Sequence, residues 1–150
     1  MLQEVISSKD APKAIGPYSP AIKIGDFIFT SGQLPLVPET NELISDDIQE
    51  QTRQCLDNLQ AVLKETGIDL NYVLKTMVYI TDMNDFAKMN EVYAEYFNDP
   101  YPARSACEVS KLAKGAKVEI EAIAIDTRAL EVICSKKGVC EENACTTVEE

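Results

Sequence analysis

The chain has 150 residues, with 25 acidic side chains against 14 Lys and Arg, a formal net charge of −11 and no histidine. This charge disfavours binding to nucleic acid or to anionic membranes, whose phosphates repel it. The lack of histidine excludes the common catalytic triads and most catalytic zinc sites. The sequence contains no run of about 18 apolar residues, so it predicts no membrane-spanning helix. The N-terminal residues resemble neither a signal peptide nor a transit peptide. We therefore expect a cytoplasmic protein.

The first part of the chain predicts short strands and a turn-rich loop. One strand is expected near residues 4–7. Residues 14–20 contain two prolines and a glycine, which are typical of a loop. Residues 22–31 contain two β-prone runs on either side of Gly25 and Asp26, a pair that favours a tight hairpin turn.

Residues 46–66 have the clearest helical pattern. The side chains of one stripe recur at steps of three and four residues, and this stripe consists of Ile48, Thr52, Cys55, Leu56, Leu59, Val62 and Leu63. Ser45 is the expected N-cap, and Gly67 is the expected end of the helix.

The rest of the folded region alternates between strands and a helix. Residues 73–81 predict a strand, and residues 83–97 predict a second helix that Asp82 caps. Two final strands are expected over residues 103–109 and 118–125. The order ββ–α–β–α–ββ predicts an α+β fold in which both helices pack on one face of a mixed sheet.

The strands carry more apolar side chains than two helices can cover. We expect that a monomer cannot cover all four of the apolar side chains Val78, Ile80, Ile123 and Ile125. Burial against another subunit would supply that cover, so the sequence predicts a homo-oligomer.

Without histidine and without a glycine-rich phosphate loop, chemistry must rest on carboxylates, hydroxyls, backbone groups and a binding cation. Arg104 follows a proline turn at the start of a strand, where a guanidinium can bind a carboxylate in bidentate fashion. From spacing alone, a structural ion pair explains it equally well. Glu119 and Glu121 share one face of a strand. A half-buried carboxylate there would suit proton transfer, although two glutamates that reach solvent are the simpler interpretation.

Three further positions give weaker signals. Tyr18, in a Gly-Pro-Tyr turn, fits a core aromatic residue better than a pocket wall. Ser31 precedes Gly32, whose N–H group can approach a ligand closely. Asn90 lies on the apolar face of the second predicted helix and needs a hydrogen-bond partner there.

Seven stretches of the chain form a recognisable set when they are taken together. They are DAPKAIGPY (10–18), TSGQ (30–33), LDNL (56–59), KT (75–76), DMNDF (82–86), PARS (102–105) and VEIEA (118–122). With them the chain resembles the RidA/YjgF family of reactive-intermediate deaminases over about residues 3–126. The last two stretches are the most specific, and they change the interpretation of Arg104 and Glu119 from structural to functional.

The resemblance implies a chorismate-mutase-like α+β fold and a homotrimer with sites in the clefts between subunits. It implies hydrolysis of 2-iminobutanoate or 2-iminopropanoate, which PLP-dependent dehydratases release, to a 2-oxo acid and ammonia, with no cofactor and no metal. Arg104 would bind the substrate carboxylate and Glu119 would position the water, with help from a backbone carbonyl near residues 106–107. The other residues that correspond to the binding pocket are Tyr18, Ser31, Gly32, Asn90, Ser105 and Ala106.

The chain departs from the family pattern at two places. Some relatives have a cysteine directly after the Arg-Ser pair, whereas here Ala106 precedes Cys107, so we give Cys107 no role in the pocket. A deaminase domain is expected over residues 1–126, and residues 127–150 form an acidic extension with Cys134, Cys140 and Cys145. Their loose spacing favours a mobile tail over a metal-binding or redox-sensitive appendage.

Other functions remain open within the resemblance. A non-catalytic member of the family could bind small carboxylate metabolites or partner proteins at the same clefts, and Arg104 alone would serve that purpose. Ribonuclease activity is disfavoured by the net charge of −11 and the lack of histidine. Chorismate mutase activity is disfavoured because the sequence offers no second arginine for the pocket.

Overall fold

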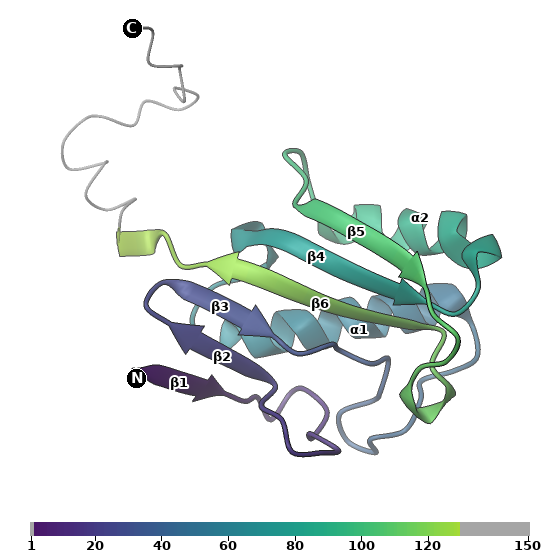
Figure 1. Cartoon of the computed structure of the whole chain (residues 1–150), viewed down its shortest axis with the longest axis horizontal. Helices are drawn as coiled ribbons and strands as arrows, with labels where there is room; N and C mark the ends of the chain where they lie inside the picture. Colours follow the sequence, from purple (N-terminus) through teal and green to yellow (C-terminus); the bar gives the residue numbers. More distant parts are fainter. Residues whose placement is uncertain (1, 130–150) are drawn as a thin grey trace, which may run out of the picture.

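The structure, a computed structural model, describes residues 2–129. Six strands form one sheet in the order β1-β2-β3-β6-β4-β5 (Figure 1), in which only the β4–β5 pair is parallel. The strands are β1 Gln3–Ile6, β2 Ala21–Ile24, β3 Phe27–Thr30, β4 Val73–Ile80, β5 Ala103–Glu108 and β6 Val118–Ile125. Most of the predicted tail, including its three cysteines, lies outside the described residues.

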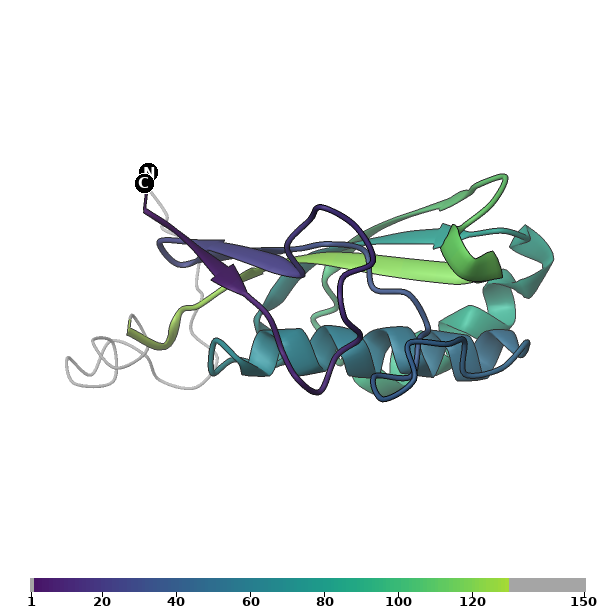
Figure 2. The same cartoon turned by 90° about the horizontal axis from the view of Figure 1, so that it is seen from below.

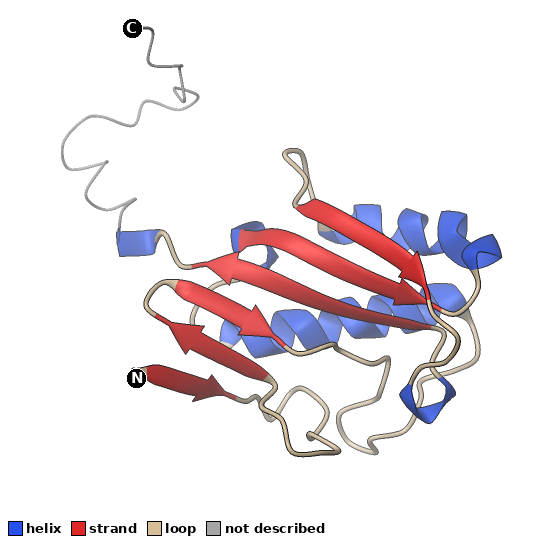
Figure 3. Ribbon diagram, viewed as in Figure 1, coloured by secondary structure: helices blue, strands red, loops and turns tan. Residues whose placement is uncertain are grey.

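The α-helices α1 (Ile48–Lys64) and α2 (Phe86–Tyr96) lie together beneath the sheet, so the domain has two layers (Figure 2). We call the sheet surface that they cover the helix face and the opposite surface the open face. Short 3₁₀ turns occur in the connecting segments (Figure 3), at Leu70–Tyr72, Met83–Asp85 and Ala113–Gly115. No helix within residues 2–129 has the length and apolar character needed to cross a bilayer. The predicted α+β fold with both helices on one face is confirmed.

Helix α1 forms where the periodic stripe predicts it, and every residue of the predicted stripe is buried. Its cap differs from the prediction. The Asp47 carboxylate accepts hydrogen bonds from the N–H groups of Gln49 and Glu50, whereas the Ser45 hydroxyl accepts one from the N–H group of Asp47. The carboxylate is better placed because it accepts two free N–H groups at the positive end of the helix dipole. The helix ends at Lys64 with Glu65 as its C-cap, earlier than the sequence predicts, and Gly67, with φ +79°, lies in the turn that follows.

The second predicted helix begins later than residue 83. Asp82 does act as a cap, but it accepts the N–H group of Asn84 at the start of a 3₁₀ turn, and α2 itself begins at Phe86. Met89 and Val92 are buried on its inner side. An Arg53–Glu95 ion pair joins the outer sides of α1 and α2, and Arg53 therefore has a structural contact.

Strict alternation along the central strand β6 separates the two faces of the sheet. Val118 and Ile120 are fully buried on the helix face, while Ile123 and Ile125 are only half-buried on the open face. Val78 and Ile80 are also fully buried, so of the four apolar side chains named in the sequence only Ile123 and Ile125 lack full cover in one chain. Val78 and Ile80 point to the helices because α1 and α2 lie directly under β4 and β6.

The open face carries a cluster of uncovered apolar side chains. Phe27 pairs with Ile125, and Phe29 pairs with Ile123 and Ile22. The two phenylalanines stay 45% and 44% exposed, with ring centroids 6.3 Å apart. An apolar surface that continues over three neighbouring strands is typical of a subunit interface rather than of a free surface.

The core stripe of α1 gives a direct test of the fold. Leu59 has no exposed surface, so Leu59→Ala should lower the free energy of unfolding by about 2–5 kcal/mol in urea denaturation. The matched control is Leu2→Ala, because Leu2 is 96% exposed and its loss should change stability by less than about 0.5 kcal/mol. Equal effects of the two substitutions would contradict the packing described above.

Candidate functional site

Arg104 lies on the helix face, at the second residue of β5. It pairs in register with Thr76 of β4, whose side chain is buried against the helices, and side chains of paired residues point to the same face. The Arg104 guanidinium carbon lies 4.6 Å from the ring centroid of Tyr93 and 5.5 Å from that of Phe86. No carboxylate within residues 2–129 forms an ion pair with it. The structural ion pair that the sequence allowed is therefore not formed there.

A cleft of ≈ 340 Å³ opens beside this guanidinium, and it is lined by Asn90, Tyr93, Ala94, Tyr101, Pro102 and Arg104. The Asn90 side-chain oxygen is buried and has no hydrogen-bond partner among the described residues. An unpaired buried acceptor is rare. The cleft thus combines a free cation with an unused acceptor, and its volume suits a small molecule.

Glu119 lies on the open face, where the alternation of β6 also places Glu121, as predicted. The segment after β3 continues along β6, because Gln33 and Ile120 exchange N–H to carbonyl hydrogen bonds of 2.8 and 3.2 Å. This pairing brings Gly32 beside Glu119. A β-carbon at position 32 would lie 1.8 Å from the Glu119 Oε1 atom, so the position of the carboxylate requires glycine.

Helix α1 and the N-terminal loop hold the segment around Gly32 in place. The Asn58 amide donates to the carbonyl oxygens of Leu34 and Leu36, both at 2.9 Å. The Ser31 hydroxyl donates to the carbonyl of Ser19 at 2.7 Å. Ser31 therefore fixes the loop that carries Tyr18, and its hydroxyl proton is used in this contact.

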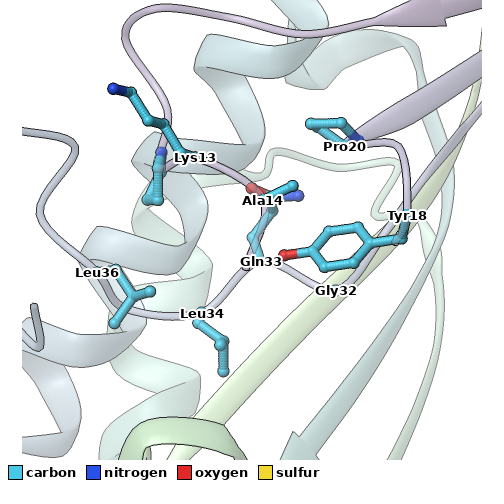
Figure 4. Close-up of a pocket in the computed structure, with 9 residues that line it drawn as sticks. Lys13, Ala14, Tyr18, Pro20, Gly32, Gln33, Leu34 and Leu36 are labelled. Atoms are coloured by element: carbon cyan, nitrogen blue, oxygen red, sulfur yellow. The ribbon is translucent and has the colours of Figure 1, made fainter. Parts of the chain in front are cut away.

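Tyr18 is 46% exposed, so the interpretation as a core aromatic residue is wrong. Its ring points toward Gln33 and borders a small cavity together with Gly32 and Ala14 (Figure 4). This cavity holds only ≈ 20 Å³, about the room that one water molecule needs. The cavity beside Tyr18 is therefore too small to bind a substrate by itself, and Tyr18 can only border a larger site.

The environment of Glu119 favours its protonated form. Burial raises the pKa of this half-buried carboxyl, and the charge of Glu121 raises it further. Both glutamates are partly buried on the open face. A carboxylate with a raised pKa is able to exchange a proton closer to neutral pH.

The candidate residues form two groups on opposite faces of the sheet. Arg104, Asn90 and Ala106 belong to the helix face, whereas Glu119 belongs to the open face with Gly32 beside it. The side chain of Ser105 alternates away from Arg104 toward the open face. The strand β4 separates β5 from β6, so the backbones of these two strands are also about 10 Å apart. One chain alone does not bring Arg104 and Glu119 to the same small molecule.

Two neighbours of Arg104 were not predicted as parts of a site. The helical period indicates that Phe86 and Tyr93 face inward, but it does not show that β5 passes over them. Cys107 is exposed on the open face, where it pairs in register with Tyr79 of β4, which in turn pairs with Glu119 of β6. No three acidic or cysteine side chains gather as a metal site in the described part of the chain.

Comparison with known proteins identifies the family. Residues 8–126 match the family model described as Endoribonuclease L-PSP. A RutC family protein of Pyrococcus abyssi is 56% identical over 124 residues, which are 83% of this chain and 98% of that protein. A mouse protein named 2-iminobutanoate/2-iminopropanoate deaminase is 46% identical and covers 83% of this chain and 93% of its own length.

The solved structure of Escherichia coli TdcF with bound serine is similar in fold. It has a TM-score of 0.78 and 43% identity over 82% of this chain and 98% of that one. The motifs, the fold and the relatives agree, and the chain belongs to the RidA/YjgF family.

Proposed function

We propose that the protein is an imine deaminase that hydrolyses 2-iminobutanoate and 2-iminopropanoate to 2-oxo acids and ammonia in the cytoplasm. The observation that carries this proposal is the guanidinium of Arg104, which faces an open cleft without a carboxylate partner in the described chain. Its free N–H groups suit bidentate binding of a substrate carboxylate. The mouse relative's name supports the reaction.

Glu119 supplies the second part of the proposed site. The reaction adds water to the carbon of a C=N bond and then expels ammonia, so its main requirement is a water molecule held in line with that carbon. A carboxylate accepts a hydrogen bond from this water and takes its proton as the C–O bond forms. The carboxyl returns this proton to the nitrogen. It then takes the remaining hydroxyl proton as the C=O bond forms and the C–N bond breaks, and passes it to the departing nitrogen, which leaves as ammonia. The raised pKa of Glu119 suits this exchange.

We further propose that the complete site forms between subunits of a homotrimer. Arg104 and Asn90 of one subunit would face Glu119, Gly32 and Tyr18 of the next, because these groups occupy opposite faces of one sheet. The uncovered apolar cluster around Phe27 and Phe29 supports an interface on the open face. Burial of such a cluster is a common source of oligomer stability.

A binding module without catalysis is the main alternative, and it would use the same cleft and the same cation. The half-buried Glu119 beside Gly32 favours the enzyme, because a carboxylate next to a carboxylate ligand would weaken simple anion binding. The family model's description names an endoribonuclease. The net charge of −11 argues against RNA as a substrate.

Loss of the cation should abolish most of the activity. With imine supplied by a threonine dehydratase and 2-oxobutanoate release recorded against the uncatalysed rate, Arg104→Ala should lower kcat/KM by about 10²-fold or more, because two charge-assisted hydrogen bonds are lost. The matched control is Arg53→Ala, which removes an exposed arginine from a surface ion pair and should leave kcat/KM unchanged. If wild type and Arg104→Ala both release 2-oxobutanoate at the uncatalysed rate, only the binding module is left, and equal rates above that level would contradict the role of Arg104.

Glu119 should control the acid side of the pH profile. Burial raises the pKa of Glu119 in the folded chain above its unfolded value, so the folded chain binds this proton more tightly. Protonation of Glu119 therefore adds to the free energy of unfolding as the pH falls through the raised pKa. Over the same interval kcat should fall, at a pH above the ordinary glutamate value of about 4.3. Glu119→Gln should lack this limb and lose about 10²–10⁴-fold in kcat.

The neighbour Glu121 offers a finer check of the same titration. Its charge is the second cause of the raised pKa of Glu119, after burial. Glu121→Gln should therefore move the acid limb to lower pH without returning it fully to the ordinary glutamate value. A limb that stays in place in Glu119→Gln would assign the titration to another group.

Mixed oligomers test whether the site spans two subunits. Arg104→Ala chains keep the Glu119 group, and Glu119→Gln chains keep the Arg104 group. Random mixing at equal amounts should restore about one quarter of the sites, because each site takes one group from each neighbour. Each variant alone should be nearly inactive. Co-expressed chains that assemble, as native mass spectrometry would report, but regain no activity would contradict a shared site.

A further inference from the structure

We propose that Tyr93 and Phe86 are positioning residues that hold the Arg104 guanidinium by cation–π contacts, and that the buried hydroxyl of Thr76 fixes Tyr93 for this role. This inference rests on the proposed function, because it explains how the carboxylate-binding cation is prepared. We call Tyr93 and Phe86 the aromatic pair.

The aromatic pair comes from one side of α2. Residues 86, 90 and 93 follow steps of four and three, so Phe86, Asn90 and Tyr93 share one face of the helix. The strand β5 crosses this face at Arg104, where the guanidinium carbon lies 4.6 Å from the Tyr93 centroid and 5.5 Å from the Phe86 centroid. Both distances lie within the range of about 6 Å over which a cation and a ring attract.

Tyr93 is held on two sides, which distinguishes it from a mobile surface ring. Its hydroxyl lies 2.8 Å from the hydroxyl of Thr76, and Thr76 has no exposed surface. Its ring packs against Phe97, with the centroids 4.6 Å apart. Tyr93 itself is only 5% exposed. The ring is therefore a fixed platform under an arginine that is otherwise on an exposed strand.

An arginine that binds a ligand is better positioned by an aromatic ring than by a neighbouring carboxylate. A carboxylate neighbour would fix the guanidinium by occupying its N–H fork, which the substrate needs. A ring instead contacts the planar face of the guanidinium and leaves the N–H edge available. A flexible arginine loses side-chain freedom when it binds, and a fixed platform reduces that loss before the ligand arrives.

The test measures KM and the Kd of the product in variants that lose one ring of the aromatic pair and in one variant that keeps the ring. Tyr93→Leu should raise both KM and the Kd of the product 2-oxobutanoate about 2- to 30-fold, the range of measured cation–π contributions, with little change in kcat. Tyr93→Phe keeps the ring and should restore most of the lost affinity. Phe86→Leu should show a smaller rise, because its centroid is farther from the cation. Isothermal titration gives the Kd, and thermal unfolding identifies variants that fail to fold.

Double variants separate positioning from packing. In the Arg104→Ala background, Tyr93→Leu and Phe86→Leu should cause no further change in the Kd, because the cation through which they act is gone. If Tyr93→Leu does not fold, Phe86→Leu carries the same comparison from a half-buried position. Unchanged affinity in both single variants, or an equal loss with and without Arg104, overturns the inference.

The same titration distinguishes this inference from the proposed function. If Arg104→Ala binds 2-oxobutanoate as wild type does, the proposed carboxylate site is wrong and the aromatic pair has no role in it. If Arg104→Ala weakens binding but the aromatic variants do not, the site stands and only the positioning role fails. Arg53→Ala again serves as the control for loss of a positive charge.

Discussion

The period of two along a β-strand decides where the chemistry of this protein can occur. On β6 it buries Val118 and Ile120 against the helices and turns Glu119 to the open face. On β5 the same alternation turns Arg104 toward α2. A sheet with helices on one side therefore holds the cation and the carboxylate on different surfaces. Subunit contact becomes a condition for the proposed reaction, as well as a source of stability.

The position of the carboxylate depends on the core as much as on β6. Asn58 belongs to α1, whose inner side packs in the core, and its amide holds the two carbonyls that follow the Gly32 segment. Ser31 ties the same segment to the N-terminal loop. The approach of backbone to Glu119 thus rests on hydrogen bonds that the packed layer keeps in place. The cation has comparable support from α2, through rings rather than hydrogen bonds.

Local patterns predicted the elements and the faces of their side chains, because helical and strand periods are properties of short segments. They predicted α1, the hairpin at Gly25 and the shared face of Glu119 and Glu121. They failed where two local solutions compete, as at the α1 cap, where Asp47 and not Ser45 accepts the first N–H groups. They also failed where the answer depends on strand order. The burial of Val78, the exposure of Tyr18 and the position of Arg104 over α2 all follow from distant segments that meet only in the fold.

The contact between Gly32 and Glu119 links two positions that lie far apart in the chain. The volume that a methyl group would need at position 32 is already filled by the carboxylate. A larger residue at 32 therefore requires a shorter or redirected side chain at 119. A side chain at position 32 acts on the carboxylate directly, by pushing it off its present place. A redesign of the proposed water site has to treat the two positions together.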